Sequence, residues 1–137
     1  MSSAYNFCNC SSDSITLSTV SILGSFIPLN KEGRLTLENV KKTVSKKTKI
    51  IAIAQITNVL GYLAPIKDIC KFAHKHDIIV VCDGAQSVPH RPTNVKDLDV
   101  DFLSFSGHKM CGPTGIGVLY GKFDLLKRMD PLMTGGG

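Results

Sequence analysis

The sequence lacks the features that would place it outside ordinary globular proteins. Of its 137 residues, 20% are charged and 43% hydrophobic, which excludes a disordered or fibrous chain. It has no tryptophan and no apolar run near the roughly 20 residues that a membrane-spanning helix needs. No Lys or Arg precedes the apolar part of the first 25 residues, so a signal peptide is not expected. At this length we expect one modest core, belonging to one domain or part of one.

The cysteines lack the pattern of a disulfide framework or of a zinc site. They are odd in number and irregularly spaced, at Cys8, Cys10, Cys70, Cys82 and Cys111. No second pair at zinc-ligand spacing follows the first two. We therefore expect no metal site, a reducing cytoplasmic location, and cysteines that serve mainly as small packing residues, Cys111 among them.

The formal net charge of +5 comes largely from one cluster of lysines. Its members are Lys41, Lys42, Lys46, Lys47 and Lys49. The cluster fits either a nucleic-acid surface or a solvated helix face with cations near the helix C-terminus. No aromatic residue lies between these lysines, and a single-strand platform needs aromatic side chains for base stacking. We therefore favour the solvated face and expect neither a nucleic-acid nor a membrane partner.

From about residue 26, segments of strand type alternate with segments of helix type. Helical spacing of apolar residues is seen in 35–47, 66–77 and 123–129, and short apolar runs typical of strands lie at 49–55, 77–83, 101–106 and 115–121. This alternation predicts an α/β fold with a mostly parallel sheet flanked by helices.

Polar residues follow three of the expected strands, in residues 55–58, 83–86 and 106–109. Ligands of parallel sheets bind beyond the carboxyl ends of the strands, so these segments are expected to meet at one edge. Asp83 ends an apolar run, and we expect its carboxylate to be partly buried, either capping the next turn or paired with a cation.

Lys109 lies in a Ser-Gly-His-Lys turn that is followed by Gly112, Gly115 and Gly117. Glycines allow a backbone to approach a ligand closely. A lysine in such a turn is either a surface charge or a functional amine. In a desolvated pocket, a lysine is suited to form a Schiff base with pyridoxal phosphate, whose pyridine nitrogen takes an acidic partner. The presence of Asp83 at the end of a neighbouring expected strand favours the functional amine, because Asp83 is a candidate acidic partner.

Three segments carry a resemblance to a known family. They read QITNVLG (residues 55–61), DGAQSVPH (83–90) and FSGHKMCGPTGIGVLYGK (105–122). They resemble PLP-dependent cysteine desulfurases of the class V aminotransferase superfamily, and the third together with DGAQ resembles the SufS-like (group II) branch, which includes selenocysteine lyases. The resemblance covers residues 26–137 and implies the central part of a fold type I large domain, whereas residues 1–25 are unmatched.

The resemblance implies a role for six residues. Lys109 would attach the cofactor and shuttle a proton, Asp83 would pair with the pyridine nitrogen, and Gln86 would hydrogen-bond the phenolic oxygen. The remaining three are Ser106 and His108, which would hold the phosphate, and Asn58, which would help bind the substrate carboxylate. No such role falls to His74, His76 or His90, which we interpret as solvated or structural.

The implied activity is removal of sulfur from L-cysteine, or of selenium from selenocysteine, giving L-alanine and a persulfide for iron–sulfur cluster assembly. Members of the family are usually homodimers that pass sulfur to an acceptor protein. The family's upstream phosphate loop and ring-stacking histidine, and its downstream persulfide cysteine and carboxylate-binding arginine, have no counterpart here. A relative that folds, and binds PLP or a partner without turnover, therefore remains the alternative.

Overall fold

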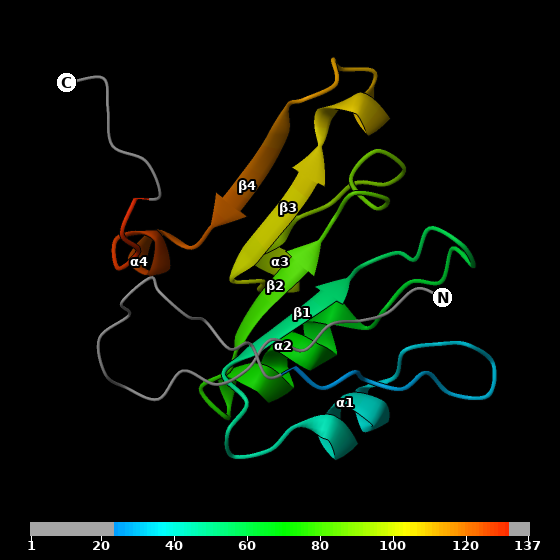
Figure 1. The fold of residues 1–137 in the computed structure, drawn as a ribbon, viewed down its shortest axis with the longest axis vertical. Helices are drawn as coiled ribbons and strands as arrows, with labels where there is room; N and C mark the ends of the chain where they lie inside the picture. The colour runs from blue at the N-terminus through cyan, green and yellow to red at the C-terminus, as the bar shows by residue number, and fades with distance from the viewer. Residues whose placement is uncertain (1–23, 132–137) are drawn as a thin grey trace.

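The structure is a computed structural model that describes residues 24–131 (Figure 1). The predictions about Cys8 and Cys10 lie outside the described residues. The elements in chain order are α1 (Leu37–Thr43), β1 (Ile50–Ala54), α2 (Ile66–His74), β2 (Ile79–Asp83), α3 (Val95–Leu98), β3 (Phe102–Ser106), the 3-10 helix η1 (Gly107–Met110), β4 (Gly117–Gly121) and α4 (Phe123–Leu126).

The strands form one sheet in the order β1-β2-β3-β4. The first three are parallel, with Ala54 opposite Asp83 and Asp83 opposite Ser104. The fourth is antiparallel to β3, so its arrow in Figure 1 points away from the edge at which the other three end. The prediction of a mostly parallel sheet flanked by helices is confirmed, and every expected helix and strand is present.

The hydrophobic core lies between one face of the sheet and the helices that cover it. Alternate strand residues such as Ile51 and Val80 are fully buried, as are Ile69 and Cys70 on the apolar stripe of α2. Cys82 points into the same cluster. Burial raises the pKa of the Cys70 and Cys82 thiols to about 12, so both are inert packing residues at neutral pH, as predicted.

Short side-chain caps define where two of the helices begin. Thr36 accepts a hydrogen bond from the backbone N–H of Asn39 at the start of α1. Asn94 accepts from the N–H groups of Lys96 and Asp97 at the start of α3. Asn is among the preferred N-cap residues, but the four-residue α3 is too short to show helical periodicity. It was not expected from the sequence for that reason.

Ion pairs tie together the opposite edge of the sheet, at the amino ends of β2 and β3. The Asp101 carboxylate, which is 7% exposed, lies 3.0 Å from His74 Nε2 and 3.0 Å from Lys122 Nζ. It also accepts a 2.7 Å hydrogen bond from the backbone N–H of Val80. Asp99 lies 3.2 Å from His74 and 2.7 Å from Lys122. His74 is thus structural, as the sequence analysis expected.

Among residues 24–131, no helix combines the length and the apolar character that crossing a membrane requires.

Candidate functional site

The three polar segments follow the carboxyl ends of neighbouring parallel strands, as predicted. Beyond the strand ends, the backbone N–H of Gln55 donates to the Asp83 carbonyl over 2.9 Å, and that of Gly84 donates to the Ser104 carbonyl over 2.8 Å. These two bonds extend the β1–β2 and β2–β3 pairing past the strands. The segments after β1, β2 and β3 therefore begin side by side at one edge of the sheet (Figure 1).

The segment after β1 is a closed loop. The N–H of Ala64 donates to the Gln55 carbonyl over 2.8 Å, and the N–H of Gly61 donates to the Thr57 carbonyl over 3.0 Å. Gly61 has a φ of 65°, which favours glycine. Arg34 stacks on the ring of Tyr62, 4.6 Å from its centroid, and ties the loop to the chain before α1. Asn58 is exposed on this loop, where its amide is free to meet a ligand.

Asp83 is exposed at the end of β2, so the prediction of a partly buried carboxylate is wrong. Residues alternate between the two faces of a strand, and Asp83 follows the less buried set. Its Oδ1 accepts a 2.8 Å hydrogen bond from the N–H of Ala85, which is the expected turn cap. Gln86 is half-buried in the same turn, and its carbonyl accepts from the His90 ring over 2.7 Å.

Lys109 lies in η1, directly after β3, and its neighbours are exposed with it. His108, Lys109 and Cys111 all stand in solvent. The expected desolvated pocket around Lys109 is therefore absent from the part of the chain that the structure describes, and the prediction that Cys111 is a packing residue is wrong. Cys111 is the residue directly after η1, with a left-handed backbone of φ 60°, and it is exposed.

Two of the glycines after Lys109 lie close to other backbone atoms of the same loop. The N–H of Gly112 donates to the Gly107 carbonyl over 3.0 Å, and a Cβ on Gly112 would lie 2.9 Å from that oxygen. A Cβ on Gly117 would lie 3.2 Å from the carbonyl of Phe105. The interpretation of Gly112 and Gly117 as points of close ligand approach stays a prediction. In the structure they allow the backbone to turn tightly after Lys109.

Three side-chain atoms near this edge are buried without a hydrogen-bond partner. They are Gln55 Oε1, Thr57 Oγ1 and Ser106 Oγ. Unpartnered buried polar atoms are rare and costly, and they often mark a place for a ligand or a water molecule. Ser106 was among the predicted site residues, whereas Gln55 and Thr57 were given no role. The signal was their position, because they directly follow an apolar strand in the same segment as Asn58.

The sequence profile of the family described as Aminotransferase class-V matches residues 20–137. A probable cysteine desulfurase of Halalkalibacterium halodurans is 53% identical over 112 residues, which cover 82% of this chain and 28% of that relative. A cysteine desulfurase of Haloferax volcanii is 46% identical over 111 residues, covering 81% of this chain and 26% of that relative.

Solved structures give the same picture. The cysteine desulfurase CsdA of Escherichia coli superposes with a TM-score of 0.77 at 42% identity, over 80% of this chain and 28% of that one. The apo cysteine desulfurase of Thermococcus onnurineus superposes with a TM-score of 0.74 at 41% identity, over 82% and 28%. The chain thus spans little more than a quarter of the length of the proteins it resembles.

Proposed function

Because the chain belongs to the class V aminotransferase family, we propose that it provides the cofactor-binding centre of a PLP-dependent cysteine desulfurase. The reaction would remove sulfur from L-cysteine and give L-alanine and a protein-bound persulfide. The observation that carries this proposal is that Asn58, Asp83 and Lys109 follow the carboxyl ends of three neighbouring parallel strands, at the edge where Ser106 Oγ is buried without a partner.

The residues at this edge fit the cofactor that the family uses. Pyridoxal phosphate has a phosphate, an aldehyde and a basic ring nitrogen, and each needs a different partner. The Ser106 hydroxyl, which has no partner in the described chain, suits a phosphate oxygen, with His108 beside it. The exposed amine of Lys109 suits the aldehyde carbon, and the exposed carboxylate of Asp83 suits the ring nitrogen.

When bound, pyridoxal phosphate supplies an electron sink for the negative charge that develops on a substrate carbon. The chain's own residues would orient the reactants and move the proton. The Ala85 N–H holds Asp83 Oδ1 in position, so the carboxylate would be held in a fixed orientation toward the ring nitrogen. Lys109 Nζ accepts and returns a proton, since a free amine is a general base. Gln86 would bind the phenolic oxygen, and Asn58 would bind the substrate carboxylate through its amide.

The finer assignments rest on the sequence motifs. We place residues 26–137 in the central part of the large domain and leave 1–25 outside it. The GPTGIG and SGHK motifs support the SufS-like branch, and with it iron–sulfur cluster assembly, selenocysteine as a second substrate, a homodimer and a sulfur-acceptor protein. The free thiols of Cys70, Cys82 and Cys111 support a reducing cytoplasmic location.

A second candidate function is binding without turnover. It is favoured by the exposure of Lys109 and by the described cysteines. Cys70 and Cys82 are buried with a pKa of about 12, and Cys111 follows the lysine. Sulfur abstraction needs a thiolate held about 3 Å from the substrate sulfur, and the rate collapses when that group is badly placed. The 137-residue chain alone should therefore bind PLP and release no alanine or sulfide.

Borohydride reduction tests the attachment site. The chain is mixed with PLP, its visible spectrum is recorded, and the reduced product is mapped by peptide mass spectrometry. We expect label on Lys109, none on Lys42, and no label at the equivalent peptide in Lys109→Ala. Label spread over the lysines of residues 41–49 would contradict the proposal.

Turnover separates the two functions. Alanine and sulfide release from L-cysteine is measured with added reductant, against Lys109→Ala and a free-PLP blank. Absence of release from the chain, together with release from the same residues joined to the flanking segments of a relative, supports the desulfurase. Release by the chain alone that Cys111→Ser abolishes would make Cys111 the nucleophile.

A further inference from the structure

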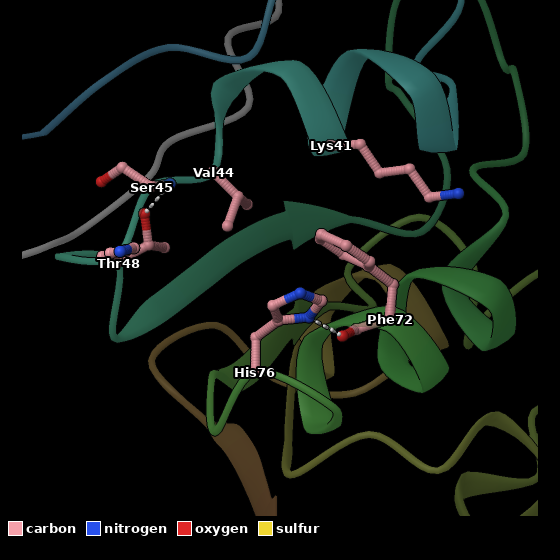
Figure 2. A pocket seen from close by; sticks show the side chains of 7 residues that line it. Lys41, Val44, Ser45, Thr48, Phe72 and His76 are labelled. Atoms are coloured by element: carbon pink, nitrogen blue, oxygen red, sulfur yellow. Dashed lines mark hydrogen bonds between the residues drawn. The ribbon is translucent and has the colours of Figure 1, made fainter.

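A groove lies on the helical side of the molecule, between the end of α1 and the end of α2. Its volume is about 640 Å³, within the range of small-molecule sites. Phe72 and His76 form one wall (Figure 2), and the other is formed by Lys41, Val44, Ser45, Lys46 and Thr48. Because α1 and α2 end near the start of β1, the groove lies at the edge opposite to Asp83 and Lys109.

The apolar part of the groove is held rigidly. The rings of Phe72 and His76 lie 4.5 Å apart between centroids, tilted by 45°. His76 Nδ1 donates to the Phe72 backbone carbonyl over 2.8 Å, which restrains the His76 ring (Figure 2). Val44 faces them from the end of α1. A planar apolar group would therefore meet a surface that is already formed, with little loss of side-chain entropy on binding.

The opposite wall is also fixed by its own hydrogen bonds. The N–H of Ser45 donates to Thr48 Oγ1 over 3.0 Å, and the N–H of Lys47 donates to Ser45 Oγ over 3.2 Å. Thr48 is 7% exposed. Both hydroxyl groups are thus used within the turn between α1 and β1. The charge of this wall therefore comes from its lysines, Lys41 and Lys46.

The polar part of the groove is cationic. Lys41 and Lys46 are exposed and line it, and the Lys41 Nζ lies 5.9 Å from the centre of the Phe72 ring. No carboxylate lines the groove, and neither lysine forms an ion pair with a carboxylate of residues 24–131. Two positive charges beside an aromatic wall are suited to a ligand that combines a negative charge with a planar apolar group.

We propose that this groove binds a small aromatic carboxylate. The ring lies against Phe72 and Val44, and the exposed lysines that line the groove, Lys41 and Lys46, attract the carboxylate. Neither the negative charge nor the ring suffices alone, because exposed ion pairs are weak and the apolar wall is small. The groove lies at the opposite edge of the sheet from the candidate cofactor site, so a ligand in the groove does not compete with PLP. The proposal does not depend on desulfurase activity.

Amide chemical shifts of the ¹⁵N-labelled chain test the ligand. Benzoate is the probe, benzamide keeps its shape without the charge, and acetate keeps the charge without the ring. We expect saturable shifts at Val44, Phe72 and His76 with benzoate, and affinity at least about tenfold lower for the other two. Equal affinity for acetate, shifts confined to residues 83–86 and 104–109, or no saturation would each overturn the proposal.

Paired lysine variants test the site with the net charge matched. Lys41→Gln with Lys46→Gln removes the two lysines of the groove, and Lys42→Gln with Lys49→Gln removes two exposed lysines of the same segment that do not line it. We expect the first pair to weaken benzoate binding at least about fivefold and the second less than about twofold. An equal loss in both would show attraction by overall charge and refute a defined site.

Discussion

The two edges of the sheet differ in how fully their polar groups are paired. At the amino edge, the Asp101 carboxylate meets His74, Lys122 and the Val80 N–H, and all three contacts are 3.0 Å or shorter. At the carboxyl edge, Ser106 Oγ and Thr57 Oγ1 are buried without a partner, while Asn58, Asp83 and Lys109 stand exposed.

The difference distinguishes polar groups that hold the fold together from polar groups that are available to bind a ligand. At the amino ends of β2 and β3, the charged groups join α2, β2, β3 and the residue after β4, so His74, Asp99, Asp101 and Lys122 are occupied with one another. At the carboxyl edge, the Ser106 hydroxyl is buried without a partner, which costs stability unless something binds it, while the Lys109 amine and the Asp83 carboxylate are exposed to solvent. Functional sites commonly break the local rules of stability in this way. Removal of a polar side chain should therefore cost more stability at the amino edge than at the carboxyl edge.

The largest effect is expected at Asp101. Asp101→Ala would leave the Val80 N–H, His74 and Lys122 without their partner in a site that is 7% exposed, and we expect a loss of about 3 kcal/mol in the free energy of unfolding. The matched change Asp83→Ala removes only the exposed cap of Ala85 and should cost less than about 1 kcal/mol. Urea denaturation measures both, and similar losses would erase the contrast.

A smaller loss is expected when the backbone of the carboxyl edge is disturbed. A Cβ on Gly84 would lie 2.9 Å from Val88 Cγ2 and 3.3 Å from the Ser104 carbonyl oxygen. Gly84→Ala should therefore cost about 2 kcal/mol by overpacking. The same urea assay checks this value. An unchanged midpoint of urea denaturation would mean that the backbone at this edge can shift to accommodate the added methyl group.

Ser106→Ala should raise stability in the absence of ligand. Its Oγ is buried without a partner. Removing this hydroxyl therefore removes the cost of an unsatisfied polar group, and the free energy of unfolding should rise by up to about 1 kcal/mol. Its control is Ser87→Ala, since Ser87 is fully buried and its hydroxyl donates to the Gly84 carbonyl over 3.4 Å. That change should lower stability. PLP affinity, followed by absorbance, should fall for Ser106→Ala, and a loss of stability there would show that the hydroxyl has a structural role.

The smallest effect is expected from the exposed side of the amino edge. The hydrogen bond from Lys122 lowers the pKa of Asp99. A lowered carboxyl pKa contributes stability above the ordinary value of about 3.9, and this contribution is lost as the pH falls through the lowered value. Asp99→Asn should cost less than about 1 kcal/mol at pH 7. Unfolding measured down to about pH 3 should show that difference shrinking, whereas a constant or growing difference would reject the ion pair as its source.

Much of the fold follows from local pattern. The apolar runs of β1 and β2 and the stripe of Ile66, Ile69 and Cys70 each identify an element, because burial repeats with the period of the element itself. The parallel arrangement follows from their alternation, and it brings Asn58, Asp83 and Lys109 to one edge. The position of those residues was therefore within reach of the sequence pattern, whereas their proposed roles came from the resemblance to the family.

The tertiary structure decided what pairs with what. His74 and Asp101 are 27 positions apart and meet only because α2 packs against β2, and no local period encodes that contact. The same holds for the exposure of Asp83 and Cys111, which depends on whether another layer covers their face, and for the groove between α1 and α2. The sequence determined the elements and the edge at which its chemistry gathers, because these follow from local periodicity, whereas burial and pairing depend on which surfaces the folded chain brings together.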